Sequence, residues 1–453
     1  MNNYEPVIGL EVHVELNTKS KMFCRCSADY FGKEPNTHTC PVCLGLPGAL
    51  PYINQSAIED CIKIGLALNC SVSPISRFER KNYFYPDLSK GYQISQYRWP
   101  LCINGQLTLD NGQVIRINRV HQEEDTGKLF HQEGQTLIDF NRSGVPLVEI
   151  VTEPDFRDVE AVRDYAKKLQ QLFRYLGVSN ADMERGDMRL EANVSVRKVK
   201  SQKSKVKNTS QNLKVEEELP PYRVELKNIN SFRFMVAAIE YEIKRQIEAL
   251  EKGEKLSQET RGWNGDKKCT YVQRSKEEAH DYRYFPEPDL PELRIEESRV
   301  KSLESSMPEL PWSKNKRFEE EFKLSTAQAK ILTETEELAD YFEGLVELGG
   351  KEGIDAVKIA NYVINQKIGA GTSVEEVLGK IKAKGEGVIG DERELEKLAQ
   401  EAISENEKAV ADYKSGKEAA LQVLIGGVMR LSKGKADTSK LKPILEKLLK
   451  VVT

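Results

Sequence analysis

The chain has 453 residues, of which 39% are hydrophobic and 30% are charged, and its formal net charge is −4. This balance excludes a protein that grips nucleic acid over its whole surface, because such proteins are usually basic. No apolar run approaches the ~18–20 residues of a membrane span, and the N-terminus lacks the basic and apolar regions of a signal peptide. We therefore expect a cytoplasmic globular protein, with about three domains by length.

The first predicted element, 6–16, alternates strictly between apolar and polar residues. Glu11 and His13 share the polar face, and aliphatic side chains share the other face. A period of two is typical of a half-buried strand. The same pattern recurs in 187–197 and 222–227, so we expect strands there as well.

Four cysteines follow the first strand. They form the pairs Cys24-Arg-Cys26 and Cys40-Pro-Val-Cys43. Clustered cysteines in a reducing compartment indicate a metal rather than disulfides, and zinc prefers four tetrahedral thiolates. Such a site has no open position, which assigns it to fold stability rather than to catalysis. Two pairs of ordinary buried cysteines are the alternative.

Carboxylates also mark two later strand-like segments. In 115–124, alternation places Glu123 on one face and Glu124 on the other. Glu149 interrupts the apolar run 145–151. A carboxylate in apolar surroundings is costly unless it has a partner, which predicts a ligand or an ion-pair partner at this position.

The polar faces of the predicted strands carry acidic and basic groups together. These groups are Glu11, Asp187, Glu191 and Glu225, with His13, Arg189, Asn193 and Lys227 beside them. If the strands share one sheet, its polar face suits Mg²⁺ and the phosphates that Mg²⁺ bridges. For any single strand, ordinary solvent exposure explains a polar face equally well.

Apolar spacing predicts helices at 58–66, 159–176 and 233–251. Between two strands, 199–215 is polar, basic and aperiodic, which predicts a mobile loop. A proline-rich stretch at 285–291 is interpreted as a domain exit.

From about residue 293 the pattern is almost entirely helical, with a weak break near 384–390. The predicted fold class is α+β, with a mostly antiparallel, cradle-like sheet domain at 1–292, a helical domain at 293–390 and a helical tail at 391–453. In the tail, nine basic residues face three acidic ones between 414 and 453. This excess is a candidate phosphate-contacting patch, and a solvated helix face is the alternative.

Several catalytic signatures are absent from the sequence. It contains neither a Gly-x4-Gly-Lys-Ser/Thr phosphate loop nor a Gly-x-Ser-x-Gly elbow, and it shows no convincing hydrolase signature. A reaction that needs ammonia from glutamine would therefore depend on another chain.

Motifs with a family resemblance run along the whole chain. They lie at 7–16, 80–88, 91–96, 121–128, 139–150, 225–232, 281–289, 426–429 and 433–435. In this order they resemble the B-type subunit of the tRNA-dependent amidotransferases, which handles the tRNA and uses ATP. The resemblance implies a heterotrimer in which an amidase subunit frees ammonia from glutamine and a small third subunit ties the complex together.

In that scheme, the B-type subunit transfers the γ-phosphate of ATP to the side-chain carboxylate of Glu on tRNA(Gln) or Asp on tRNA(Asn). Ammonia then displaces the phosphate and leaves the amide. The substrate carboxylate is already ionised at neutral pH, so positioning and charge neutralisation dominate the chemistry. A non-discriminating aminoacyl-tRNA synthetase, which supplies the mischarged tRNA, is a further expected partner.

The resemblance also implies site residues. Expected Mg²⁺ ligands are Glu11, His13, Glu123, Glu124, Glu149 and Glu191, of which Glu11, His13, Glu124 and Glu149 are the expected catalytic set. Alternation allows only one of Glu123 and Glu124 to bind metal, unless a β-bulge intervenes. Expected groups for phosphate or the tRNA 3′ end are Arg80, Lys81, Asn82, Tyr83, Arg189, Lys227 and Asn228. Arg430, Lys433 and Lys435 are expected to contact the body of the tRNA.

The sequence departs from the family pattern in two places. Many members have a short link before the motif at 223–228, where this chain has the basic loop, so contact of that loop with tRNA stays open. Many members also lack the four cysteines, so zinc is not required for the chemistry of the family.

Three other functions are weighed against this one. A subunit that only docks tRNA does not call for so many carboxylates. A zinc-stabilised RNA-binding protein explains the cysteines but not the motif series. The archaeal-type (E-type) paralogue carries an inserted domain for which this chain has no room.

Overall fold

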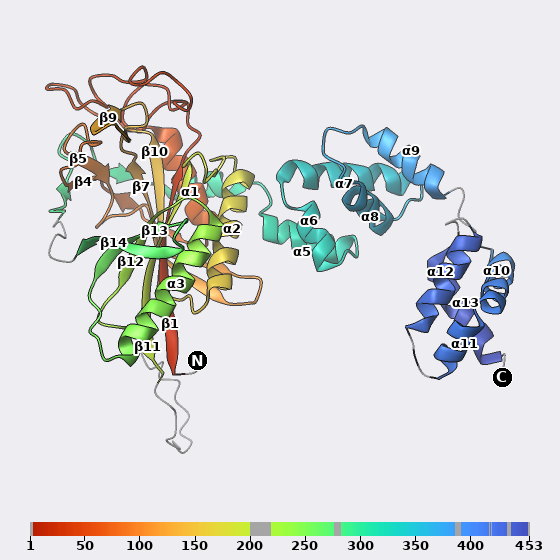
Figure 1. The fold of residues 1–453 in the computed structure, drawn as a ribbon. Coiled ribbons are helices and arrows are strands. Elements are labelled where there is room, and N and C mark those ends of the chain that lie inside the picture. The colour runs from red at the N-terminus through yellow and green to blue at the C-terminus, as the bar shows by residue number, and fades with distance from the viewer. Residues whose placement is uncertain are drawn as a thin grey trace, which may run out of the picture. The chain divides into compact units, whose positions relative to one another are not determined.

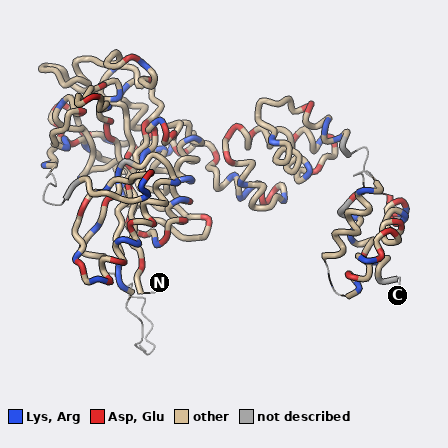
Figure 2. The backbone as a smooth tube through the Cα atoms, in the orientation of Figure 1, with Lys and Arg blue, Asp and Glu red and all other residues tan. Residues whose placement is uncertain are grey.

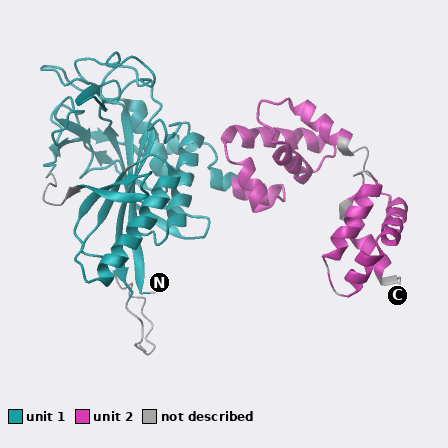
Figure 3. Cartoon of the chain, viewed as in Figure 1, with its two compact units in different colours: residues 1–314 teal, residues 315–453 magenta. Residues whose placement is uncertain are grey.

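The computed structural model describes residues 3–199, 219–275, 282–385, 391–415, 417, 419–432 and 436–451. The chain divides into two compact units, residues 1–314 and 315–453 (Figure 3). Acidic and basic residues are interspersed in both (Figure 2). None of the described helices is both long and apolar enough to cross a membrane.

A nine-stranded sheet organises the first unit (Figure 1). In spatial order its strands are β14 (Cys269–Ser275), β13 (Glu259–Asn264), β12 (Val224–Ile229), β11 (Met188–Lys198), β1 (Tyr4–Glu15), β10 (Pro146–Thr152), β7 (Val114–Glu124), β6 (Cys102–Thr108) and β2 (Ser71–Val72). Only β12 and β13 pair in parallel within this sheet. The mostly antiparallel sheet predicted from the alternating segments is therefore confirmed.

Three helices cover one face of the sheet (Figure 1). They are α1 (Gln55–Ala67), α2 (Val159–Tyr175) and α3 (Phe232–Glu251), close to the predicted ranges. Each begins at a side-chain cap: Asn54, Asp158 and Ser231 accept backbone N–H bonds from the first turn. After α3, Gly253 adopts a φ of +78°, which suits a glycine beyond a helix end.

The core lies between these helices and the apolar face of the sheet. Ile8, Leu10, Val12 and Val14 of β1 are buried there against residues of α1 to α3. Because successive side chains of a strand point to opposite faces, this burial turns Glu11 and His13 to the other side.

Short strands surround the open face of the sheet. They are β3 (Ile75–Ser76), β4 (Glu79–Asn82), β5 (Tyr92–Ser95), β8 (Lys128–Gln132), β9 (Gln135–Asp139), β15 (Phe285–Pro286) and β16 (Leu293–Arg294). The β15 strand pairs with β4, and β16 pairs with β3. The proline-rich segment therefore belongs to the first unit, which continues through α4 (Glu297–Ser305) to Lys314.

The second unit is helical in its described part. Its elements are α5 (Pro311–Glu321, which begins in the first unit), α6 (Thr326–Leu332), α7 (Glu336–Lys351), α8 (Ala356–Gln366), α9 (Val374–Gly385), α10 (Glu392–Glu405), α11 (Glu407–Lys414), α12 (Ala420–Leu431) and α13 (Thr438–Val451). Two separate apolar clusters lie within it, from Phe318 to Leu378 and from Leu395 to Leu449. The predicted boundaries at 292 and 390 stay predictions.

Candidate functional site

A cavity of about 930 Å³ opens on the polar face of the sheet. Its floor comes from β1, β7, β10, β11 and β12, and residues of β4, β5 and the segment 282–284 form a wall. Register explains why the floor is charged, because His13 lies opposite Glu149, and Glu149 lies opposite His121. Direct partners in neighbouring antiparallel strands share a face, so these three side chains form one row.

One group of candidate metal ligands lies along this row. A ring nitrogen of His13 and carboxylate oxygens of Glu123 and Glu149 lie within 4.8 Å of one another. His13 Nε2 lies 3.6 Å from Glu149 Oε2, and His121 Nε2 lies 3.2 Å from the same oxygen. Burial raises the pKa of Glu149, but the two neighbouring histidines outweigh it and hold that pKa well below its usual range.

The Glu123 carboxylate is held in place by neighbours from β4 and β5. Gln93 Nε2 donates to Glu123 Oε2 at 3.1 Å, the Ser95 hydroxyl donates to Oε1, and Lys81 Nζ lies 3.8 Å from Oε1. Burial opposes ionisation of Glu123, yet Lys81 and His121 lower its pKa to about 2. Glu123 is therefore an ionised carboxylate in a fixed orientation.

A second acidic group lies beside the first. Carboxylate oxygens of Glu11, Glu191 and Glu225 lie within 4.8 Å of one another. Lys227 Nζ donates to Glu191 at 2.7 Å and lies 3.3 Å from Glu225. Burial and the three neighbouring carboxylates, Glu149, Glu191 and Glu225, raise the pKa of Glu11. Burial also disfavours ionised Glu191, but Lys227 outweighs it, so the pKa of Glu191 is lowered.

The donor set of both groups suits a hard divalent cation. Five carboxylates and one imidazole offer mainly oxygen ligands, which Mg²⁺ prefers, and the open cavity leaves room for water or substrate oxygens. Like-charged carboxylates this close also favour a cation between them. The residues present thus fit one or two Mg²⁺ ions.

Glu124 lies outside the cavity lining, although Glu123 lies within it. Its Oε1 accepts the Ile94 backbone N–H at 2.9 Å and also contacts Lys90 Nζ. Alternation along β7 explains the difference between these neighbours, since they point to opposite faces. Of the two glutamates, Glu123 is the one that the structure groups with His13 and Glu149.

The predicted phosphate-binding residues separate into two sets. Lys81, Tyr83, Arg189 and Lys227 line the cavity. Arg80 is outside the lining and pairs with Glu287 through both its Nε and NH2 atoms, at 2.7 and 2.8 Å.

Asn82 is also engaged elsewhere, since its side-chain amide donates to the backbone carbonyls of Arg80 and Arg283. Asn228 belongs to β12, but its side chain lies outside the described residues.

Sequence reasoning left several cavity residues unassigned. The imidazole of His121, only 2% exposed, contacts Glu149 and Glu123. Its position two residues before Glu123 was a usable signal. Tyr97 and Tyr284 stack with ring centroids 4.6 Å apart, and both line the cavity. No local pattern joins two tyrosines so far apart in the sequence.

Arg189 is held by a further carboxylate at the cavity wall, that of Asp125. Its NH1 and NH2 donate to the two oxygens of Asp125 at 3.1 and 2.6 Å. Asp125 in turn lies beside Glu15, whose carboxylate accepts the Tyr30 hydroxyl. Burial and the neighbouring Asp125 raise the pKa of Glu15 to about 8.

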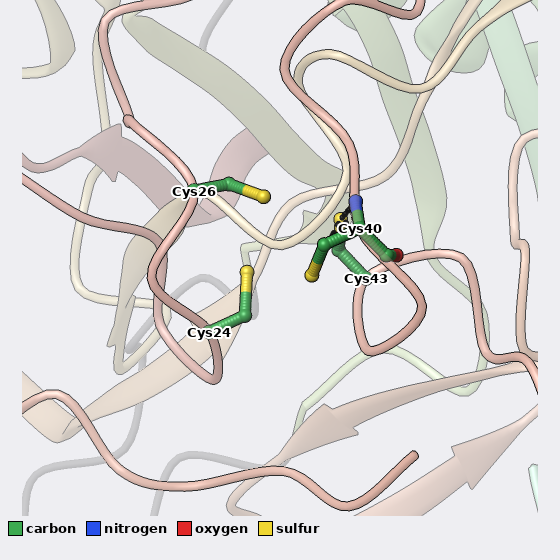
Figure 4. A group of neighbouring side chains, drawn as sticks. All are labelled: Cys24, Cys26, Cys40 and Cys43. Carbon is green, nitrogen blue, oxygen red and sulfur yellow. Dashed lines mark hydrogen bonds between the residues drawn. The ribbon is translucent and has the colours of Figure 1, made fainter. Parts of the chain in front are cut away.

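The four cysteines converge at one point of the first unit (Figure 4). The sulfur atoms of Cys24, Cys26, Cys40 and Cys43 all lie within 4.8 Å of one another. The Cys40 backbone N–H donates to Cys43 Sγ at 3.1 Å, a hydrogen bond that orients this sulfur atom. Four soft sulfur donors in this arrangement fit a closed zinc site.

Of the three residues predicted to contact the body of the tRNA, only Arg430 lies among the described residues. Arg430 is exposed on α12, and its NH2 donates to Glu405 at 2.6 Å. Lys433 and Lys435 lie outside the described residues, as does nearly all of the basic loop 199–215.

Comparisons with known proteins place this chain in a family. The GatB/GatE catalytic domain matches residues 6–301, and the GatB domain matches residues 323–449. The B-type subunit of the aspartyl/glutamyl-tRNA(Asn/Gln) amidotransferase of Dehalococcoides mccartyi (strain CBDB1) is 43% identical over 505 aligned residues, covering 99% of both chains. The proteins of that name from Thermodesulfovibrio yellowstonii and Carboxydothermus hydrogenoformans are each 44% identical, covering 99% and 100% of both chains. The chain therefore belongs to the family of B-type subunits of the aspartyl/glutamyl-tRNA(Asn/Gln) amidotransferases.

Proposed function

We propose that this chain is the subunit of a glutamine-dependent tRNA amidotransferase that activates and amidates the amino acid on mischarged Glu-tRNA(Gln) or Asp-tRNA(Asn). The observation that carries the proposal is the cavity, where two clusters of carboxylates and several basic side chains share one face of a sheet. A surface that only docks tRNA has no need for buried carboxylates, because phosphates repel them.

The first step is a phosphoryl transfer. A carboxylate oxygen of the tRNA-bound side chain attacks the γ-phosphorus of ATP, the bond to the β–γ bridging oxygen breaks, and ADP leaves. The attacking group is already ionised, so the protein supplies no base and has to hold the two anions in line. Divalent cations in the cavity would neutralise charge on the phosphates.

Residues of the cavity have distinct parts in this step. Glu123, Glu149 and His13 would hold one Mg²⁺, and Glu11, Glu191 and Glu225 a second. Lys81, Arg189 and Lys227 offer positive charge to the transferring group. Glu124, engaged by Lys90 and Ile94, is not proposed as a ligand.

In the second step, ammonia attacks the acyl carbon, phosphate leaves and a proton is lost. The stacked pair Tyr97 and Tyr284 flanks the cavity, and such apolar ring faces reduce the water that competes with ammonia. A partner amidase would supply the ammonia, and a small third subunit would complete the heterotrimer in the cytoplasm. A non-discriminating synthetase would supply the tRNA.

The remaining parts have supporting roles in this proposal. The sheet unit is the catalytic cradle, the four cysteines hold a structural zinc ion, and the helical tail around Arg430, Lys433 and Lys435 contacts the tRNA body. The two apolar clusters of the second unit support a helical domain and a separate tail.

An amidation assay tests the proposal. The amidase and the small third subunit, glutamine, Mg-ATP and Glu-tRNA(Gln) are combined with and without this chain, and ADP and Gln-tRNA(Gln) are measured. We expect both products only when the chain is present. Glutamine hydrolysis without ADP or Gln-tRNA(Gln) formation would leave the chain with a docking role only and contradict the proposed phosphoryl transfer.

A further inference from the structure

Lys21 is a fully buried lysine, with 0% of its surface exposed. It follows the strand β1 and precedes the first cysteine pair. Burying an ammonium group is costly unless an anion and hydrogen-bond acceptors compensate for the lost water. The surroundings of Lys21 therefore indicate which anion its position requires.

The Lys21 ammonium reaches three acceptors. Its Nζ lies 2.8 Å from the His38 carbonyl oxygen, 3.4 Å from the Phe140 carbonyl oxygen and 3.8 Å from Cys43 Sγ. Carbonyls satisfy its N–H groups but carry no net charge. Among the ion pairs found in the described residues, none joins Lys21 to a carboxylate. A thiolate at Cys43 is the contact that can balance the charge.

A bound metal ion would keep the Cys43 sulfur in its deprotonated, negatively charged form. A divalent ion with four thiolates carries a net charge of about −2 in the tetrathiolate arrangement described for zinc. With four neutral thiols instead, the ammonium would be buried without a counter-charge. Whatever stabilises the loaded cluster through this ammonium must, by linkage, also stabilise the ammonium through the cluster.

We propose that Lys21 is a positioning residue of the four-cysteine site, whose ammonium is the built-in counter-charge of the metal-loaded thiolates and favours the loaded state. Its two carbonyl contacts also join the cysteine loop at His38 to the segment at Phe140. The inference rests on the metal centre of the proposed function, but it does not depend on the amidation chemistry.

The variant Lys21→Met tests the counter-charge, because it keeps the chain length and removes the ammonium. Lys19→Met is the matched control, since Lys19 lies two residues away and is exposed. Both are made in the full chain, purified with its partner subunits, and zinc affinity is measured by competition with a chromophoric chelator. We expect Lys21→Met to bind zinc at least tenfold more weakly, and Lys19→Met to match the unaltered protein.

Cobalt substitution gives a readout that a purely structural lysine would not move. A positive charge beside a sulfur atom holds its lone pairs more tightly, so removing it lowers the energy of the thiolate-to-cobalt charge-transfer band. A shift to longer wavelength is expected for Lys21→Met and not for Lys19→Met. Lys21→Gln, which keeps N–H donors without charge, is expected to resemble Lys21→Met and serves if the methionine variant does not fold.

Unchanged zinc affinity and an unshifted cobalt band in Lys21→Met would overturn the counter-charge. Wild-type behaviour of Lys21→Gln beside a weakened Lys21→Met would also overturn it, because hydrogen bonding alone would then explain the effect. If the unaltered chain binds no zinc, the metal centre fails together with this inference, whereas the amidation assay remains a separate test.

Discussion

The four-cysteine site and the carboxylate cavity lie in the same unit, but the chain builds them in different ways. The cysteines come from one short stretch, Cys24 to Cys43, whereas the candidate ligands of the cavity extend from Glu11 to Glu225 over five strands. Sulfur donors that face one centre close the first site, and the second stays open to incoming oxygen atoms. A local loop is thus enough to gather four sulfur atoms, whereas the open carboxylate cavity needs strands from the whole sheet.

The two regions also differ in how their charge is balanced. In the cavity, His13, His121 and Lys227 already pair with the carboxylates. The cysteine site has only Lys21 as a nearby cation among its described contacts. We therefore expect the cavity to keep its shape without metal and the cysteine site to depend on metal for stability.

The largest effect is expected from Glu149→Ala. It removes a ligand of the proposed first Mg²⁺, leaves His13 without its anion and leaves His121 with Glu123 alone, so amidation should fall about a thousandfold, as for other groups that stabilise transition-state charge. ATP-dependent amidation of the intact complex is the measurement. Glu160→Ala, on the exposed surface of α2, is the control. Full activity of the Glu149 variant would contradict the site.

The double substitution Cys40→Ser and Cys43→Ser should disrupt the four-cysteine site. Zinc should fall from about one ion per chain to almost none, and the free energy of unfolding should drop by roughly 3 kcal/mol, as for other lost metal sites. Metal analysis and denaturant unfolding are the measurements, with Cys269→Ser, outside the cluster, as the control. Amidation per folded complex should change less than twofold, and a thousandfold loss would erase the distinction between the two sites.

A smaller effect of opposite sign is expected for Lys227→Met. Without this ammonium, the carboxylates of Glu191 and Glu225 lose an internal cation, so Mg²⁺ should bind about tenfold more tightly, or about 1.4 kcal/mol. Calorimetric titration without nucleotide measures this, and Lys168→Met, whose partner Asp110 lies away from the cavity, is the control. Weaker Mg²⁺ binding would show that Lys227 orients the ligands instead.

The smallest effect concerns Glu15 and pH. Burial and Asp125 raise its pKa to about 8 in the folded chain, against about 4.3 for an unperturbed Glu. Between these values the folded state holds a proton that the unfolded state has released, so stability falls as pH rises. Glu15→Gln should reduce this loss by about 1 kcal/mol between pH 5 and pH 6. The free energy of unfolding in urea is measured at both pH values, with Glu160→Gln as the control. The same change with pH in Glu15→Gln and in the unaltered chain would contradict the prediction.

The sequence predicted the elements of the cavity floor better than the contacts between them. Strict alternation placed Glu11 and His13 on the polar face, and the structure confirms that face. Glu149 was predicted to need a partner from its apolar neighbours alone, and it has two histidines. Burial patterns are local, so they can be read along one strand.

Register is not local, and here the sequence was less informative. Glu149 lies opposite His121 only because of the register in which β10 pairs with β7, and His121 was left out of the predicted site. Arg80 was expected near phosphate because of the family resemblance, and the pairing of β15 with β4 brings Glu287 to it, a partner that the sequence did not indicate. The partner of Arg80 comes from a segment 207 residues further along the chain.

The row of His13, Glu149 and His121 across neighbouring strands has a mechanical consequence. Strands lie about 4.8 Å apart in a sheet, so backbone pairing sets the spacing of these groups. The opposite face carries the packed layer of α1, α2 and α3. A substitution such as Leu169→Ala in that layer could thus alter the curvature of the floor and the spacing of the ligands without touching any of them. Substitutions in the cores of the helices are therefore expected to change activity through the spacing of the cavity residues, even at positions that contact none of them.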